Sequence, residues 1–226
     1  EAGSRSTFNG QLSAVVPIKG ASLSVNGNVF TTGGYNISDP AGEADGSKSR
    51  SVNVGLNNVR LGAVTLSAKG SVSKLESEFD TGFPFPVDTN DELTTDARSG
   101  RVDARFDLAG FEHLLTLSAN ETAAANPNAG FRNDITGDRT TANWAAKKVW
   151  GAHTLTVLAE TEKEGFTTFG GAGAGQNQTQ SIRNEALAAD YRFTDRFSAF
   201  TRIDNVLDKN YIVARRPSGV RPGKPQ

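Results

Sequence analysis

The sequence has no cysteine and almost no net charge, and each lack excludes a class of function. None of its 226 residues is Cys, so it has neither a disulfide framework nor a thiolate for catalysis or metal binding. Its 24 Lys and Arg residues nearly balance its 25 Asp and Glu residues, which leaves a formal net charge of −1. Because nucleic-acid-binding proteins usually carry a basic surplus, we expect no nucleic-acid partner.

Long apolar runs and catalytic constellations are also missing. No stretch approaches the roughly 18 consecutive apolar residues of a transmembrane helix. The chain does not begin with a charged and then apolar leader, so we expect that any signal peptide has been removed or lies outside this sequence. His113 and His153 stand without a second histidine at metal-ligand spacing, which favours a role at a strand end over a zinc site or a catalytic triad. We predict no enzymatic activity.

What the sequence does have is a strict alternation of residue types. Residues 101–108 read Arg-Val-Asp-Ala-Arg-Phe-Asp-Leu. In a β-strand, successive side chains point to opposite faces, so this segment would have one charged and one apolar face, whereas a helix would scatter the charges around its circumference. The same period of two returns at 22–29, 64–69, 154–159, 187–193 and 197–204. The chain is predicted to be all-β, with about ten strands.

The connections between these segments alternate in length. Long polar segments at 34–47, 79–96, 124–138 and 167–180 alternate with turn-prone pairs near Lys19-Gly20, Asn57-Asn58, Ala109-Gly110, Trp150-Gly151 and Thr194-Asp195. Outer-membrane barrels have short periplasmic turns and longer extracellular loops. The alternation therefore favours an antiparallel transmembrane β-barrel over a soluble sandwich. We treat residues 1–226 as one barrel domain.

A barrel assigns a role to each face of its strands. Arg or Lys on the lipid face costs roughly 2 to 4 kcal/mol at the midplane, so Arg101, Asp103, Arg105 and Asp107 should line a wet lumen. Aromatic residues fit two interfacial girdles. One would lie by the short turns (Phe111, Trp150, Phe193 and Phe197) and one toward the long loops (Phe30, Tyr35, Phe79 and Phe166).

Several segments resemble the TonB-dependent outer-membrane receptors. Gly33-Gly34-Tyr35-Asn36-Ile37-Ser38, with the acidic Glu43-Ala44-Asp45-Gly46 after it, looks like the early barrel of the cobalamin-receptor type. Thr194-Asp195-Arg196-Phe197 followed by Asn205-Val206-Leu207-Asp208-Lys209-Asn210-Tyr211 resembles the penultimate-strand motif of that family. The tail from Arg215 to Pro225 resembles the last extracellular loop of its siderophore receptors.

The resemblance implies an outer-membrane receptor or transporter in a Gram-negative bacterium. Such proteins take up a scarce ligand, such as a ferric siderophore or cobalamin, and are driven by TonB acting through a plug domain inside a 22-stranded barrel. This sequence shows no plug, about ten strands and no final strand after Gln226. We therefore expect a partial barrel without the plug, the middle strands and the last strand. Its expected surroundings are outer-membrane lipid and lipopolysaccharide.

The resemblance also suggests site residues. Receptors of this family contact their ligand through aromatic and polar side chains on long loops, so the candidate ligand-binding residues are Tyr35, Phe83, Phe85, Phe131, Phe169, Arg215 and Arg216. Guanidinium groups such as those of Arg215 and Arg216 suit the carboxylate and catecholate oxygens of a siderophore. Each of these arginines has an alternative interpretation as a solvated or lipopolysaccharide-facing residue.

A calcium site is the only cofactor that the sequence suggests. Asp39, Glu43 and Asp45 place three carboxylates in one loop, and hard oxygen ligands suit Ca²⁺. Cobalamin receptors bind calcium at about this place, although the spacing does not fit an EF-hand and a solvated acidic loop is the simpler interpretation. Three other functions remain open. The chain could be a small passive pore or adhesin, a receptor fragment that does not transport, or a soluble secreted β-sandwich.

Overall fold

The computed structural model describes residues 2–36, 42–81, 87–126, 133–170, 178–194, 196–205, 212–216 and 219–222. In chain order its main strands are β1 (Phe8–Ile18), β2 (Ala21–Tyr35), β3 (Asp45–Leu61), β4 (Val64–Thr81), β5 (Val87–Leu108), β6 (Phe111–Ala125), β7 (Asn133–Trp150), β8 (His153–Gly170), β9 (Gln178–Thr194) and β10 (Phe197–Asp204). No helix in this part of the chain is long and apolar enough to cross a membrane.

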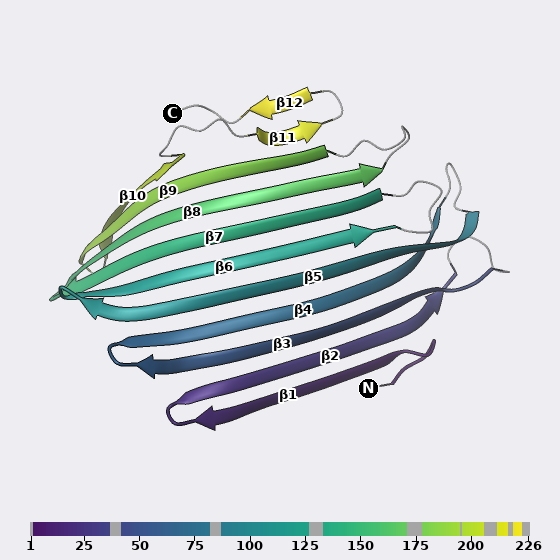
Figure 1. Cartoon of the computed structure of the whole chain (residues 1–226), viewed down its shortest axis with the longest axis horizontal. Helices are drawn as coiled ribbons and strands as arrows, with labels where there is room; N and C mark the ends of the chain where they lie inside the picture. The colour runs from purple at the N-terminus through teal and green to yellow at the C-terminus, as the bar shows by residue number, and fades with distance from the viewer. Residues whose placement is uncertain are drawn as a thin grey trace.

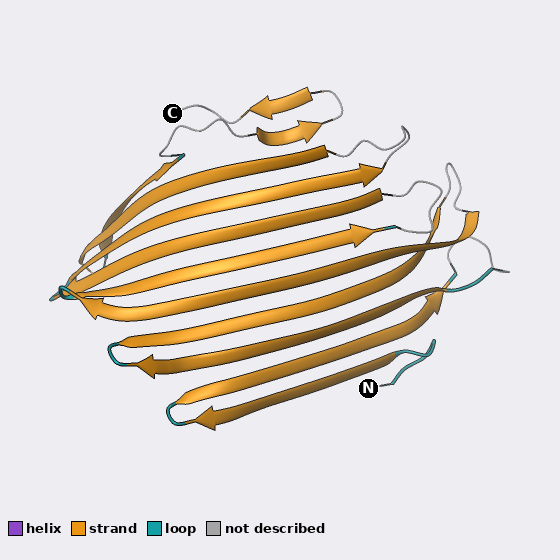
Figure 2. Cartoon of the chain, viewed as in Figure 1, coloured by secondary structure: helices purple, strands orange, loops and turns teal. Residues whose placement is uncertain are grey.

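The ten strands form one antiparallel sheet in which neighbours in sequence are neighbours in space, from β1 to β10 (Figures 1 and 2). The prediction of an all-β, antiparallel fold with about ten strands is confirmed. Within the described residues the sheet does not close, since β1 and β10 each pair on one side only. β11 (Ile212–Arg216) and β12 (Gly219–Pro222) form a separate two-stranded ribbon.

Most of the predicted short turns are present, but one is wrong. Lys19 and Gly20, like Ala109 and Gly110, have positive φ angles at both central positions, as a two-residue type I′ hairpin requires. The pair at 57 and 58 is not a turn but a register irregularity inside β3, where Asn58 has φ 59°. The chain turns instead at 62 and 63. Asn tolerates a left-handed backbone in a bulge as well as in a turn, so residue type could not separate the two.

The strands extend well into the segments predicted as long loops. β4 continues to Thr81 and β5 already begins at Val87, so most of the range 79–96 is strand rather than loop. The reason is that these strand ends are polar on both faces, which hides the period of two. The connections at this edge of the sheet, on the right in Figure 1, are therefore shorter than the sequence suggested.

The register brings the alternating residues of all ten strands into two opposite faces. Val102 lies between Ala68 and Leu117, and this set continues as the apolar face, whose larger members include Leu12, Val16, Leu23, Val25, Val52, Val54, Leu56, Val64, Leu66, Val72, Phe106, Leu108, Leu115, Val157 and Leu187. The opposite, polar face carries Ser, Thr, Asn and charged side chains, among them Arg101 and Asp103.

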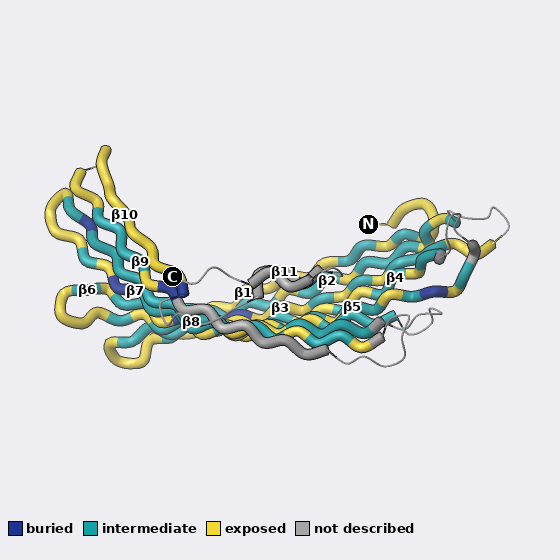
Figure 3. The backbone as a smooth tube through the Cα atoms, turned by 90° about the horizontal axis from the view of Figure 1, so that it is seen from above, coloured by how far each residue is buried: buried dark blue, intermediate teal, exposed yellow. Residues whose placement is uncertain are grey.

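This sheet has almost no interior of its own. Figure 3 shows one curved layer of strands, and the buried apolar residues of the described part are only Ala146 and Ala186. Large apolar side chains are instead exposed, with Leu12 at 71%, Leu108 at 61% and Leu117 at 60% of their full accessibility. Water is a poor solvent for a contiguous apolar surface of this kind, so the apolar face needs a covering that is itself apolar.

Aromatic rings border the apolar face at the turn end of the strands. His113 stacks on Phe106 and Trp144 with ring centroids 5.1 and 5.9 Å apart. His153 stacks on Trp150 and Tyr191, both at 5.9 Å. Phe193 and Phe197 extend the row at 5.3 Å. The predicted girdle beside the short turns is therefore present, and both histidines belong to it.

The predicted second girdle is wrong for all four of its members. Phe30 pairs with Ser49, Tyr35 with Asp45, Phe79 with Asp91 and Phe166 with Gly137, so the strand alternation puts these four rings on the polar face. Their place along the chain fitted an interfacial ring, but each is one residue out of phase with the apolar face. A shift of one residue reverses the face in a strand.

Candidate functional site

The polar face contains a hollow of about 530 Å³ over the middle of β2 to β6. Its side chains are mostly hydroxyls and amides, from Ser24, Asn26, Asn53, Ser71, Ser99, Ser118 and Asn120, with Lys69 and Arg101 as the two cations. Small and uncharged polar residues leave room and offer hydrogen bonds in both directions. The hollow can therefore accommodate a polar solute without a fixed charge pattern opposing it.

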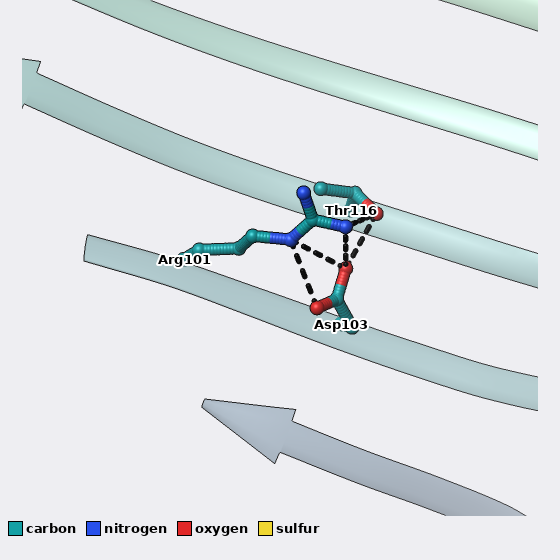
Figure 4. Close-up of polar contacts among 3 residues, drawn as sticks. All are labelled: Arg101, Asp103 and Thr116. Atoms are coloured by element: carbon teal, nitrogen blue, oxygen red, sulfur yellow. Dashed lines mark hydrogen bonds and ion pairs between the residues drawn. The ribbon is translucent and has the colours of Figure 1, made fainter. Parts of the chain in front are cut away.

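Arg101, Asp103 and Thr116 form a bonded cluster at the edge of this hollow (Figure 4). The Arg101 guanidinium donates to the Asp103 carboxylate from Nε at 2.9 and 3.0 Å and from Nη2 at 2.8 Å. Thr116 Oγ1, on the neighbouring strand β6, donates to Asp103 Oδ1 at 2.6 Å. The carboxylate thus ties two strands together and holds the arginine close to the sheet.

Further ion pairs continue across the polar face. Arg139 Nε lies 2.9 Å from Glu162 Oε2 and 3.0 Å from Glu164 Oε1. Arg202 Nε lies 2.8 Å from Asp204 Oδ1. These pairs are partly exposed and each stabilises the fold only slightly. Together they balance positive and negative charge on this part of the polar face, which we call the ion-paired wall. The lumen-facing interpretation of the row from Arg101 to Asp107 agrees with their position on this polar face.

Tyr35 is the candidate ligand residue whose surroundings the structure describes most fully. Gly34, with φ +62°, makes a bulge at which any Cβ would come within 1.7 Å of the Asp45 carbonyl oxygen, so only glycine fits. The bulge lets Tyr35 pair with Asp45 at the loop end of the sheet. The Arg5 guanidinium lies 4.9 Å from the centre of the Tyr35 ring, which is 57% exposed.

The other candidates are scattered. Phe169 lies on β8 opposite Asp134 and is 42% exposed. Arg215 and Arg216 lie on β11, paired in register with Val220 and Gly219 of β12. Phe83, Phe85 and Phe131 lie outside the described residues. Apart from the consecutive Arg215 and Arg216, the structure brings no two of the candidates together among the residues that it describes, and Tyr35 and Phe169 lie on different strands.

The calcium loop is described only in part. Glu43 is exposed, Asp45 begins β3 and is half-buried, and Asp39 lies outside the described residues. Gly46 N donates to Glu78 Oε2 at 2.8 Å, so a further carboxylate approaches this loop from β4. Among the described residues no three Asp, Glu or His side chains gather into a group that could hold a metal. The calcium site stays a prediction.

Sequence reasoning missed the polar hollow and the ion pairs between strands, such as that of Arg139 with Glu162. Both depend on which residues of adjacent strands lie opposite one another. The glycines at 55, 70 and 100 were a usable signal, because glycine inside a strand often marks a close approach or a hollow.

Comparison with known proteins assigns the chain to no family. Neither a scan of protein-family models nor a search of curated proteins found a match to the chain. The class that the fold itself defines is an antiparallel sheet of ten strands with one apolar and one polar face.

Proposed function

We propose that the chain is part of the wall of an outer-membrane receptor barrel that takes up a scarce ligand, such as a ferric siderophore or cobalamin. One observation carries the proposal. The sheet is a single layer in which most of the exposed large apolar side chains lie on one face, while the opposite face carries mainly hydroxyls, amides and paired charges. Strands that alternate apolar-out and polar-in are the pattern of outer-membrane barrels.

The height of the apolar face supports a membrane location. On β5 it extends from Gly100 to Leu108, about 27 Å at the usual rise of a strand, or about 20 Å of depth at a tilt of about 40°. This is close to the apolar band of roughly 25 Å in outer-membrane barrels. Aromatic residues border this band at the turn end, as they do at membrane interfaces.

The polar face supports passage or capture of a polar ligand. Its hollow of about 530 Å³ is lined by serine and asparagine side chains with two cations, Lys69 and Arg101. The ligand class and the dependence on TonB rest on the resemblance of the segments at 33–46 and 194–225 to siderophore and cobalamin receptors. No residue in this proposal acts as a catalyst.

The test has two stages. Cell fractionation should place the protein in the outer membrane, extractable by detergent and resistant to high salt. The protein that carries this chain should then bind a ferric siderophore or cobalamin, and the double substitution Arg215→Ala with Arg216→Ala should weaken siderophore binding. A protein that is soluble and monomeric without detergent would refute the membrane location. Siderophore affinities unchanged by the double substitution, with cobalamin still bound, would favour cobalamin.

A small passive pore is the second candidate. The ion-paired wall of the polar face, with Arg139 between Glu162 and Glu164, suits an aqueous channel and requires no plug. Single-channel conductance without ligand specificity would favour this candidate over the receptor.

A further inference from the structure

The apolar face carries a groove of about 540 Å³ that the proposed function does not use. Its floor is formed where Gly70 pairs with Gly100 and Gly100 pairs with Ala119, across β4, β5 and β6. Val52, Val54 and Val72 form one of its walls. A volume of this size is within the range of small-molecule pockets.

The backbone conformation does not require glycine at positions 70 and 100. Neither has a positive φ angle. A Cβ added at Gly100 would meet nothing within 4 Å, and one added at Gly70 would meet only the Ser99 carbonyl oxygen at 3.8 Å. Glycine in a strand interior weakens the strand, so a larger residue would be expected here if the fold alone mattered. Their effect is to keep the groove open.

A second hollow, of about 280 Å³, lies farther along the same strands toward the loop end. It is lined by Lys48, Arg50 and Lys74 together with Glu76. Arg50 pairs in register with Lys74, only two residues along the strands from the pair Val52 and Val72 that walls the apolar groove. Two residues of strand correspond to about 7 Å, so the cationic hollow and the apolar groove adjoin on one face.

The charges of this hollow are only partly compensated. Lys74 Nζ pairs with Glu76 Oε1 at 2.5 Å. In the part of the chain that the structure describes, Lys48 and Arg50 form no side-chain hydrogen bond or ion pair with another residue. In the lining of the apolar groove, Arg98 Nη2 donates to both carboxylate oxygens of Glu121 at 2.7 Å, and Asp138 lies beside them in the same lining. The surplus of the smaller hollow is therefore cationic and can be matched by an anion.

We infer that the two hollows together bind one phosphorylated lipid of the outer leaflet, with the chemistry of lipopolysaccharide. A phosphate would lie against Lys48 and Arg50, and an acyl chain would lie in the groove over Gly70 and Gly100. The inference rests on the proposed membrane location, because only there does the apolar face meet lipid. The loop end of the strands is then the outer leaflet, where barrels carry their longer loops.

In the test, lipopolysaccharide is added to the detergent-solubilised full chain, and the lipid that the protein retains after removal of the excess is quantified by mass spectrometry. Phosphatidylcholine, a zwitterionic lipid, serves as the comparison. Gly100→Val fills the groove, and Lys48→Gln with Arg50→Gln removes the cations. Each variant should retain at least tenfold less lipopolysaccharide than the wild type, while β-type circular dichroism is unchanged. Gly27→Val is the matched control, since Gly27 lies on the same face outside both hollows and its added Cβ would meet only the Ser51 carbonyl oxygen at 3.9 Å.

Three results would overturn the lipid site. They are unchanged retention in Gly100→Val, equal retention of phosphatidylcholine, and displacement of the lipid by inorganic phosphate alone, which would indicate an anion site without an acyl chain. Because lipid is added to solubilised protein, the measurement does not depend on where the protein resides. A soluble protein would therefore refute the proposed function independently of this result.

Discussion

Placing a charge on the apolar face is the most direct test of what covers that face. Leu117, on β6, is 60% exposed in the sheet and lies on the apolar face between Val102 and Ala142, two residues toward the loop end from the middle of that face at Leu115. If water covered it, Leu117→Arg would be nearly neutral, within about 0.5 kcal/mol, as is usual for exposed positions. If lipid covers it, the same change should cost about 1 to 3 kcal/mol of unfolding free energy at this depth, or roughly a 5- to 140-fold change in the folding equilibrium.

The matched control is Asn53→Arg. Asn53 is exposed on the polar face of β3, where it pairs with Asn26 and Ser71 rather than with a charged residue. In a wet lumen this new arginine should change the free energy of unfolding by no more than about 0.5 kcal/mol. The introduced side chain is arginine in both variants. The difference between their unfolding free energies therefore reports mainly on the environment of the two faces.

The assay is urea unfolding of the protein in lipid vesicles, followed by the fluorescence of Trp144 and Trp150, the only two tryptophans of the chain. We expect the unfolding midpoint of Leu117→Arg to fall while that of Asn53→Arg stays near the wild type. Equal midpoints in the two variants would refute the assignment of the apolar face to lipid.

Three further predictions follow from particular contacts. Single Cys substitutions along 101–108 in the membrane-inserted protein should react with a water-soluble thiol reagent in alternation, strongly at Arg101, Asp103, Arg105 and Asp107; uniform labelling would contradict the two-face arrangement, and the chain has no native Cys to confuse the result. Thr116→Val removes the 2.6 Å hydrogen bond to Asp103 and should cost about 1 kcal/mol in a denaturation curve, whereas Thr141→Val, also on the polar face, should be near neutral. Millimolar Ca²⁺ should slow hydrogen exchange in the loop at 39–45 if Asp39, Glu43 and Asp45 are ligands; unchanged exchange would dismiss the calcium site.

The faces of the sheet could be predicted from the sequence because their signal is local. In the segment 101–108 charged and apolar residues alternate, so the sequence alone assigns each side chain to a face. The register confirms that Val102 and Leu117 share one face. Phe30, Phe79 and Phe166 show the limit of this reasoning. Their approximate position along the strands was predicted correctly, yet a difference of one residue puts them on the polar face.

The hollows could not be predicted, because they depend on pairing between distant residues. Gly70 and Gly100 are 30 positions apart in sequence and lie opposite one another only in the register of β4 and β5. The hydrogen bond from Thr116 to Asp103 likewise crosses from β6 to β5. The candidate ligand residues were chosen by resemblance instead, and of these the structure describes the side chains of only Tyr35 and Phe169.

The two free edges of the sheet, along β1 and β10, constrain how the sheet can assemble in a membrane. Along β1 and β10 one row of backbone groups lacks a strand partner within the described residues. In hydrocarbon each such group costs several kcal/mol, since no water can satisfy it. The apolar face favours the membrane and the unpaired edges oppose it, so both conditions are met together only when further strands pair with β1 and β10. Those strands, whether from a longer polypeptide or from other copies, must continue the alternation with apolar residues in phase with Leu12 on one side and Ile203 on the other.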